Sequence, residues 1–111
     1  MKEINSENVR AQMRKGLLEF ATLLIIARGE AYTSDIIEEL KKSDLLVVEG
    51  TLYPLLSRLR TAGILEHRWE ESKSGPPRKY YSVSKKGEQT LQALTESWKP
   101  LQTSIQKLIK E

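Results

Sequence analysis

The stretch from Val48 to Tyr81 most constrains the fold of this chain, because it predicts a fixed succession of local structures. It reads as a short helix, a glycine turn, a strand, a loop rich in glycine, proline and basic residues, and a second strand. The helix has one apolar stripe at the i, i+3, i+4, i+7 spacing, formed by Leu52, Leu55, Leu56 and Leu59. This succession is typical of a helix followed by a β-hairpin wing.

We expect this helix to begin at about Gly50–Thr51, with Thr51 as its N-cap, so that Pro54 falls in the first turn. The first-turn N–H groups have no partner within a helix, so proline is tolerated there. Gly63 would follow the C-cap. The polar face carries Thr51, Tyr53, Ser57, Arg58 and Arg60. Such a face fits a DNA major groove, but an ordinary solvated surface helix has the same pattern.

The predicted wing consists of the strands Ile64–Trp69 and Lys79–Val83, joined by a loop from Ser72 to Arg78. Such a loop taken alone would be a plain solvated turn. However, the segment from Ser57 to Lys86 has eight basic and three acidic residues, a net charge of +5, whereas the entire chain carries +3. Positive charge gathered on a helix and a wing is the electrostatic footprint of phosphate binding.

Three segments of this stretch resemble the signature of the PadR family of bacterial transcriptional regulators: Gly50–Leu56, Arg58–Leu59 with Gly63–Leu65, and Gly75–Tyr81. The resemblance implies a mainly α (α+β) fold, a winged helix-turn-helix with N-terminal and long C-terminal dimerisation helices. It also implies a homodimer on a palindromic operator in double-stranded DNA, with ligand-controlled repression. We therefore expect DNA contacts from Tyr32, Thr33, Ser34, Glu49, Thr51, Tyr53, Pro54, Ser57, Arg58, Lys73, Arg78 and Lys79.

The length of 111 residues predicts one domain, 1–111, with the winged helix-turn-helix at 6–84 and the C-terminal dimerisation helix at 85–111. The chain has no cysteine and one histidine, His67, so we expect no metal site, no nucleophilic triad and no enzyme. The sequence has no glycine-rich phosphate loop, so we expect no nucleotide cofactor. No apolar run approaches the roughly 20 residues that span a bilayer, and the start has no apolar signal core, so we expect a cytoplasmic protein.

A first helix is predicted from about Ser6, as N-cap, to Ala27, with an apolar stripe and a second half that is apolar nearly all round. The stripe consists of Val9, Met13, Leu17, Phe20, Ala21 and Leu24. We expect the second half to be buried, either by a second subunit or by core packing alone. The next helix would begin with Thr33 or Ser34 as its cap. Tyr32 before it would reach a phosphate or stay in the core.

The last helix would begin at Ser84, a good N-cap, and carry an apolar seam spaced 3, 4, 3, 4, 3: Leu91, Leu94, Trp98, Leu101, Ile105 and Leu108. The seam suits packing against the first helix of a partner subunit, although it also suits packing within its own chain. Pro100 removes one helical hydrogen bond and clashes one turn back. We expect a kink between about Glu96 and Pro100, or a break there.

Glu96-Ser97-Trp98 together with Arg10-Ala11-Gln12 resembles the multidrug-sensing branch of the PadR family. The resemblance implies that Trp98 stacks on flat aromatic ligands in a central pore, although a tryptophan that fills a dimer core has the same pattern. The neighbouring pore positions would be Asn8, Ala11, Gln12, Lys15, Thr95 and Gln102. Asn8, Lys15 and Thr95 replace apolar residues there, and Gln102 replaces an acid. We therefore expect weaker binding of cationic drugs.

A second class of function fits the same fold. Winged helices also act as protein–protein interaction modules, in which the wing and third helix bind a partner. Such a module would bind an acidic protein and show no preference among DNA sequences. The basic wing and the face with Thr51, Tyr53 and Arg58 favour DNA, because an interaction module need not gather positive charge there.

Overall fold

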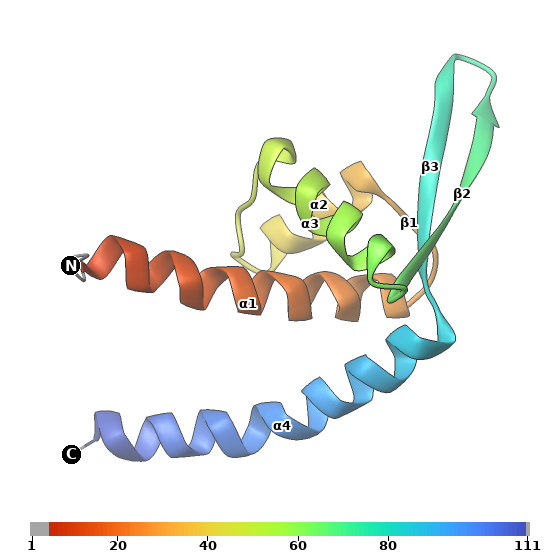
Figure 1. Ribbon diagram of the computed structural model, residues 1–111. Helices are drawn as coiled ribbons and strands as arrows, with labels where there is room; N and C mark the ends of the chain where they lie inside the picture. The colour runs from red at the N-terminus through yellow and green to blue at the C-terminus, as the bar shows by residue number, and fades with distance from the viewer. Residues whose placement is uncertain (1–4, 111) are drawn as a thin grey trace.

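The computed structural model describes residues 5–110, and within them it shows four helices and one small antiparallel sheet (Figure 1). The elements follow in the order α1 (Ser6–Ala27), β1 (Ala31–Tyr32), α2 (Thr33–Lys42), α3 (Glu49–Thr61), β2 (Leu65–Ser72), β3 (Gly75–Val83) and α4 (Lys85–Ile109). The predicted mainly α winged helix-turn-helix is confirmed. Residues 1–4 and 111, the ends of the predicted domain, lie outside the described part.

The core lies where α1, α2, α3 and the base of the sheet meet. The predicted leucine stripe of α3 is confirmed, since all four of its leucines are buried. The second half of α1 contributes Leu18, Leu23 and Ile26 to this core, as predicted, while its stripe residue Leu24 stays exposed. The side of α3 opposite the stripe is exposed.

The sheet has the strand order β1-β3-β2, and the wing is longer than predicted. β2 and β3 pair from Leu65↔Val83 to Glu70↔Arg78, with an irregularity before Ser72↔Gly75. The predicted loop from Ser72 to Arg78 was wrong, because only Lys73 and Ser74 form the turn. Pro76 and Pro77 lie opposite the irregularity, where a missing N–H interrupts little pairing.

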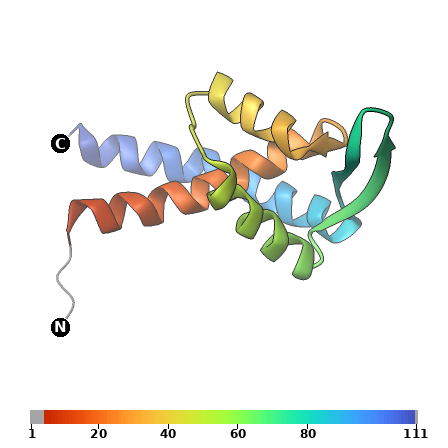
Figure 2. The same ribbon diagram turned by 90° about the horizontal axis from the view of Figure 1, so that it is seen from above.

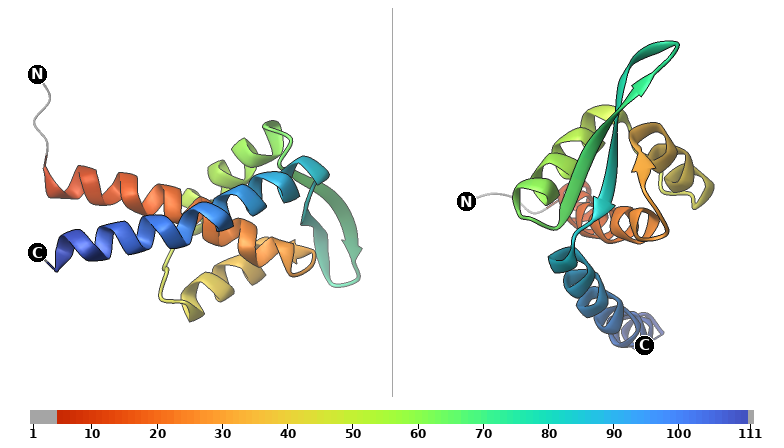
Figure 3. Two further views of the ribbon diagram at one scale, coloured as in Figure 1. Left: turned by 90° about the horizontal axis from the view of Figure 1, so that it is seen from below. Right: turned by 90° about the vertical axis from the view of Figure 1, so that its right-hand side faces the viewer.

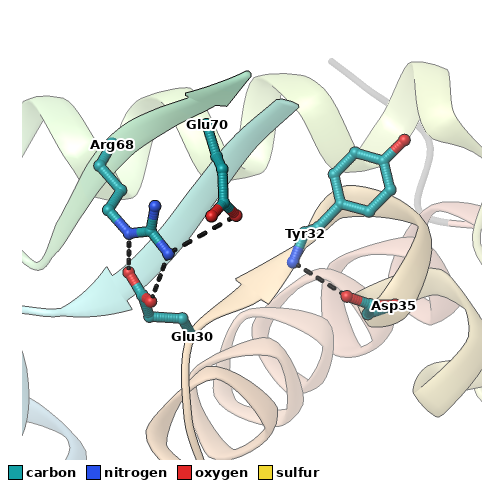
Figure 4. A network of polar contacts seen from close by, with 5 residues as sticks. All are labelled: Glu30, Tyr32, Asp35, Arg68 and Glu70. Carbon is teal, nitrogen blue, oxygen red and sulfur yellow. Dashed lines mark hydrogen bonds and ion pairs between the residues drawn. The ribbon is translucent and has the colours of Figure 1, made fainter. Parts of the chain in front are cut away.

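The predicted bounds of α1, Ser6–Ala27, are confirmed, but three predicted N-caps were wrong. The cap of α1 is Asn5 rather than Ser6, because its side-chain oxygen accepts the Asn8 N–H at 2.9 Å. Tyr32 rather than Thr33 or Ser34 precedes α2, and Asp35 reaches back to accept the Tyr32 N–H at 3.3 Å (Figure 4). α3 begins at Glu49 after Val48, so neither Thr51 nor Pro54 has its predicted place.

Pro54 therefore lies in the second turn of α3, where it leaves the Gly50 carbonyl without its usual helical donor. Gly50 is exposed, so water can satisfy that carbonyl. The other end follows the prediction: Gly63 has φ 80° after the C-cap Ala62. The Ile64 N–H donates to the Leu59 carbonyl at 2.9 Å, which closes the helix in a Schellman arrangement.

Ser84 joins the wing to α4, and its predicted role as N-cap is confirmed. Its hydroxyl oxygen accepts the Gly87 N–H at 3.0 Å and lies 2.5 Å from the Gly63 carbonyl oxygen. α4 then runs unbroken through Pro100. The predicted break is therefore absent, and Figure 1 shows α4 curving along its length. The hydroxyls of Thr95 and Ser97 donate to carbonyls one turn back, an arrangement that bends helices.

α1 and α4 run in opposite directions, and their free ends extend together away from the sheet (Figures 1 and 2). The molecule is accordingly elongated, with extents of 57 × 30 × 30 Å. Most of the α4 seam is exposed: Leu101 is 60% exposed, Ile105 55% and Leu108 70%. Among the described residues, no helix is both long and apolar enough to cross a bilayer.

Candidate nucleic-acid interface

A groove of about 450 Å³ lies between the wing and the helices α2 and α3. The view along the molecule in Figure 3 shows the wing rising beside α3 and the start of α2. The groove brings together five residues predicted to bind DNA: Tyr32, Thr33, Tyr53, Arg78 and Lys79. Residues from the start of α2, from α3 and from the wing thus face one space, although up to 47 positions separate them in the chain.

The two wing cations of this groove lie over aromatic rings. The Arg78 guanidinium is 4.8 Å from the centre of the Tyr32 ring, and Lys79 Nζ is 5.0 Å from the Trp69 ring. Cation–π attraction orients such side chains without neutralising them. Neither residue takes part in the ion pairs formed within residues 5–110. Their charge therefore remains available to phosphates.

Other basic residues of the predicted patch are already paired. Arg68 donates to both Glu30 oxygens, at 2.6 and 2.9 Å, and lies 3.8 Å from Glu70 (Figure 4). This bonding lowers the pKa of Glu30 and raises that of Arg68. Lys86 Nζ donates to the Ala62 carbonyl at 2.9 Å, at the C-terminal end of α3. The net charge of the segment thus overstates the unpaired positive charge on this surface.

Arg58, a predicted base reader, forms an ion pair with Glu19 of α1. It lines a second groove, between α1 and α3, together with the predicted DNA residues Thr51 and Pro54. The structure thus divides the predicted DNA residues between two sides of α3. The remaining four, Ser34, Glu49, Ser57 and Lys73, are exposed and line neither groove.

Trp69 is a groove residue that the sequence analysis did not select. It is 61% exposed on β2 and lines the groove together with Tyr53 and Arg78. A large exposed aromatic beside cations suits contact with sugars or bases. No local pattern marked it, because its neighbours in the groove, Tyr53 and Arg78, come from α3 and β3.

Positive charge also perturbs His67 on the same face. Burial, then Lys79 and Arg60, lower its pKa below the ordinary value of 6.5. Its ring lies 6.5 Å from that of Trp69, between centroids. DNA phosphates close to this face would favour the protonated imidazole, so binding DNA should raise the His67 pKa again.

The predicted ligand residue Trp98 lines a shallow hollow of about 300 Å³ between α1 and α4. Its ring meets that of Phe20, with centroids 6.2 Å apart. The other wall residues are Leu17, Ala21, Leu24 and Leu45. The remaining predicted pore residues do not line this hollow within one chain: Asn8, Ala11, Gln12, Lys15, Thr95 and Gln102 are exposed on α1 and α4. Within residues 5–110, no cluster of three potential metal ligands occurs.

Comparisons with known proteins agree with this geometry. Residues 22–93 match the profile of the transcriptional regulator PadR-like family. A PadR-like transcription factor from Bacteroides fragilis is 50% identical, with 91% of this chain and 98% of that chain covered and a TM-score of 0.80. A PadR-like transcriptional regulator from Bacillus cereus is 36% identical, with 90% and 98% covered and a TM-score of 0.79.

A curated relative from Lysinibacillus sphaericus, an uncharacterized protein, is 27% identical over 93 residues, which cover 81% of this chain and 85% of that protein. The family profile spans well over half of the chain, and the likeness to solved PadR structures covers almost all of it. The chain therefore belongs to the PadR-like family of transcriptional regulators, which act by binding DNA.

Proposed function

We propose that the protein is a repressor that binds a palindromic operator as a homodimer in the cytoplasm. The groove between α3 and the wing is the observation that carries this proposal, because Tyr53, Arg78 and Lys79 face it together. α3 would enter the major groove, and the wing cations would hold the flanking phosphates. A change at Tyr53 should alter sequence preference, whereas a change at Arg78 should weaken binding to all sequences alike.

The exposed apolar residues of α1 and α4 support the homodimer. Val9 and Met13 are 43% and 64% exposed on α1, and Leu101, Ile105 and Leu108 are at least 55% exposed on α4. Large exposed apolar patches mark surfaces that another chain covers. In the proposed dimer, α4 of one subunit covers α1 of the other, and the two α3 helices read half-sites about one helical turn apart.

A small planar aromatic ligand at Trp98 would release the operator. The hollow beside Trp98 and Phe20 supports this part of the proposal, since aromatic walls favour stacking. In the dimer, the second subunit would bring the predicted pore residues of its own α1 and α4 close to this hollow. The ligand lowers DNA affinity only as far as it prefers the dimer geometry that does not fit the operator. Gln102, which is uncharged, argues against a strong preference for cations.

The proposal is tested with the double variant Leu101→Lys/Ile105→Lys, which places charges in the exposed apolar face. Thr103→Lys/Gln106→Lys is the matched control, because Thr103 and Gln106 lie together on the polar side of the same helix. Light scattering should give a dimer for the wild type and the control, and a monomer for the apolar-face variant. Fluorescence anisotropy with a labelled duplex should show the variant binding more weakly. A monomeric wild type, or no duplex binding at about 50 mM salt, would overturn the proposal.

A further inference from the structure

One row of side chains runs across all three strands of the sheet. Tyr32 of β1 stands opposite Tyr80 of β3, and Tyr80 stands opposite Arg68 of β2. Side chains at directly opposite positions of neighbouring strands share one face of the sheet. The Tyr32 and Tyr80 rings lie 5.9 Å apart between centroids, and the Arg68 guanidinium lies 5.1 Å from the centre of the Tyr80 ring. We call these three residues the sheet ladder.

Both ends of the sheet ladder are bonded to other parts of the chain. At one end, Glu30 accepts two hydrogen bonds from the Arg68 guanidinium, at 2.6 and 2.9 Å (Figure 4). Such bidentate pairs between arginine and a carboxylate fix the geometry of both groups. At the other end, the Tyr32 N–H donates to the Asp35 side chain in the first turn of α2, at 3.3 Å. The Tyr32 ring is therefore held between α2 and the wing.

The Tyr32 ring in turn lies against Arg78. The Arg78 guanidinium is exposed and lies 4.8 Å from the centre of this ring. An exposed arginine loses rotamer freedom when a phosphate fixes it, and this loss of entropy weakens binding. A cation–π contact orders the guanidinium in advance and leaves its charge available.

From this arrangement we propose that Arg68 and Tyr80 are positioning residues for Arg78. They act through the Tyr32 ring, which orders the Arg78 guanidinium before DNA arrives. Less conformational entropy is then lost when Arg78 meets a phosphate. This inference rests on the proposed function, in which Arg78 holds a phosphate beside α3.

The variants separate the ladder from the phosphate contact itself. Tyr80→Leu removes the ring between Arg68 and Tyr32, whereas Tyr80→Phe keeps the ring and should restore wild-type behaviour. Arg68→Ala breaks the ladder independently, at its other end. Arg28→Ala is the matched control, because Arg28 also forms an exposed ion pair, with Glu39 at 3.3 Å, but belongs to α1 and α2 rather than to the ladder.

NMR relaxation of the Arg78 Nε–H group in the free protein measures the order of this side chain directly. We expect a lower order parameter in Tyr80→Leu and in Arg68→Ala than in the wild type, Tyr80→Phe and Arg28→Ala. Equal order parameters in all five proteins would overturn the inference. This measurement needs no DNA, so it decides whether the ladder orders Arg78 even if the protein binds none.

Fluorescence anisotropy with a labelled duplex measures the effect on binding. Tyr80→Leu and Arg68→Ala should each weaken binding by about two- to tenfold per subunit, and the salt slope should stay, because Arg78 still reaches the phosphate. In the Arg78→Ala background, the same substitutions should have little further effect. Equal weakening in both backgrounds would show a merely structural role and overturn the positioning. Failure of the wild type to bind any duplex would instead overturn the proposed function.

Discussion

Replacing Arg78 by alanine tests the wing most sharply, because its charge is exposed and unpaired. Arg78 lies in the groove beside Tyr53, with its guanidinium 4.8 Å from the Tyr32 ring centre. It contributes nothing to the buried core. The substitution should therefore leave the free energy of unfolding nearly unchanged and act on DNA binding alone.

The magnitude follows from counterion release. Each phosphate contact contributes about 0.9 to the slope of log affinity against log salt concentration. A dimer carries two copies of Arg78, so the variant should flatten this slope by roughly 1.8. Between about 50 and 200 mM salt, the ratio of wild-type to variant affinity should then shrink by roughly 12-fold.

Fluorescence anisotropy with a labelled duplex at several salt concentrations measures this slope. Arg68→Ala is the control, because Glu30 already holds the Arg68 guanidinium through two hydrogen bonds. The control removes the same charge from the same wing, yet its slope should stay close to that of the wild type. An unchanged slope for Arg78→Ala, or equal flattening by both variants, would refute the assignment of the phosphate contacts.

The remaining predictions concern other parts of the molecule. The pKa of His67 is lowered in the folded chain, so its contribution to the free energy of unfolding is fully present above about pH 6.5. This contribution is lost as the pH drops below that value. His67→Gln should remove the loss, as measured by urea unfolding at several pH values. DNA affinity should rise over the same acidic range, because phosphates favour the protonated imidazole, and the variant should lose this rise too. Gly87→Ala should lower the free energy of unfolding in urea by about 1–3 kcal/mol, because a Cβ there would lie 2.1 Å from the Ile64 carbonyl oxygen. Gly16→Ala is the control and should not lower it, because a Cβ at Gly16 would meet open space. In Trp98→Phe, the remaining Trp69 fluorescence should change on duplex binding; an unaltered spectrum would place Trp69 outside the interface.

The sequence predicted the elements that have a repeating pattern. The leucine stripe of α3 is buried on one face because apolar spacing records which side of a helix avoids water. The seam of α4 is mostly exposed in the single chain, so its packing against a partner stays a prediction. Gly63 and Ser84 were predictable for a local reason, since each meets a backbone requirement at a helix end. β1 was missed because a two-residue strand has no alternation to detect.

The partners of the charged residues were not predictable from the sequence. Arg68 bonds to Glu30, 38 residues away, and Arg58 pairs with Glu19, which also lies far off in the chain. Counting charges along a segment therefore overstated the unpaired positive charge of the wing and α3. Trp69 was missed for a related reason, because its neighbours in the groove come from α3 and β3. The predicted residue contacts with DNA and ligand stay predictions.

Selection from a random pool of duplexes, with the purified protein at near-physiological salt, tests the central claim most directly. The account predicts enrichment of a palindrome whose half-sites lie about one helical turn apart, or roughly 10 base pairs. That result would establish a symmetric dimer that reads sequence through α3. Retention of DNA without enrichment, or no retention, would contradict the account and favour a winged helix that binds an acidic protein.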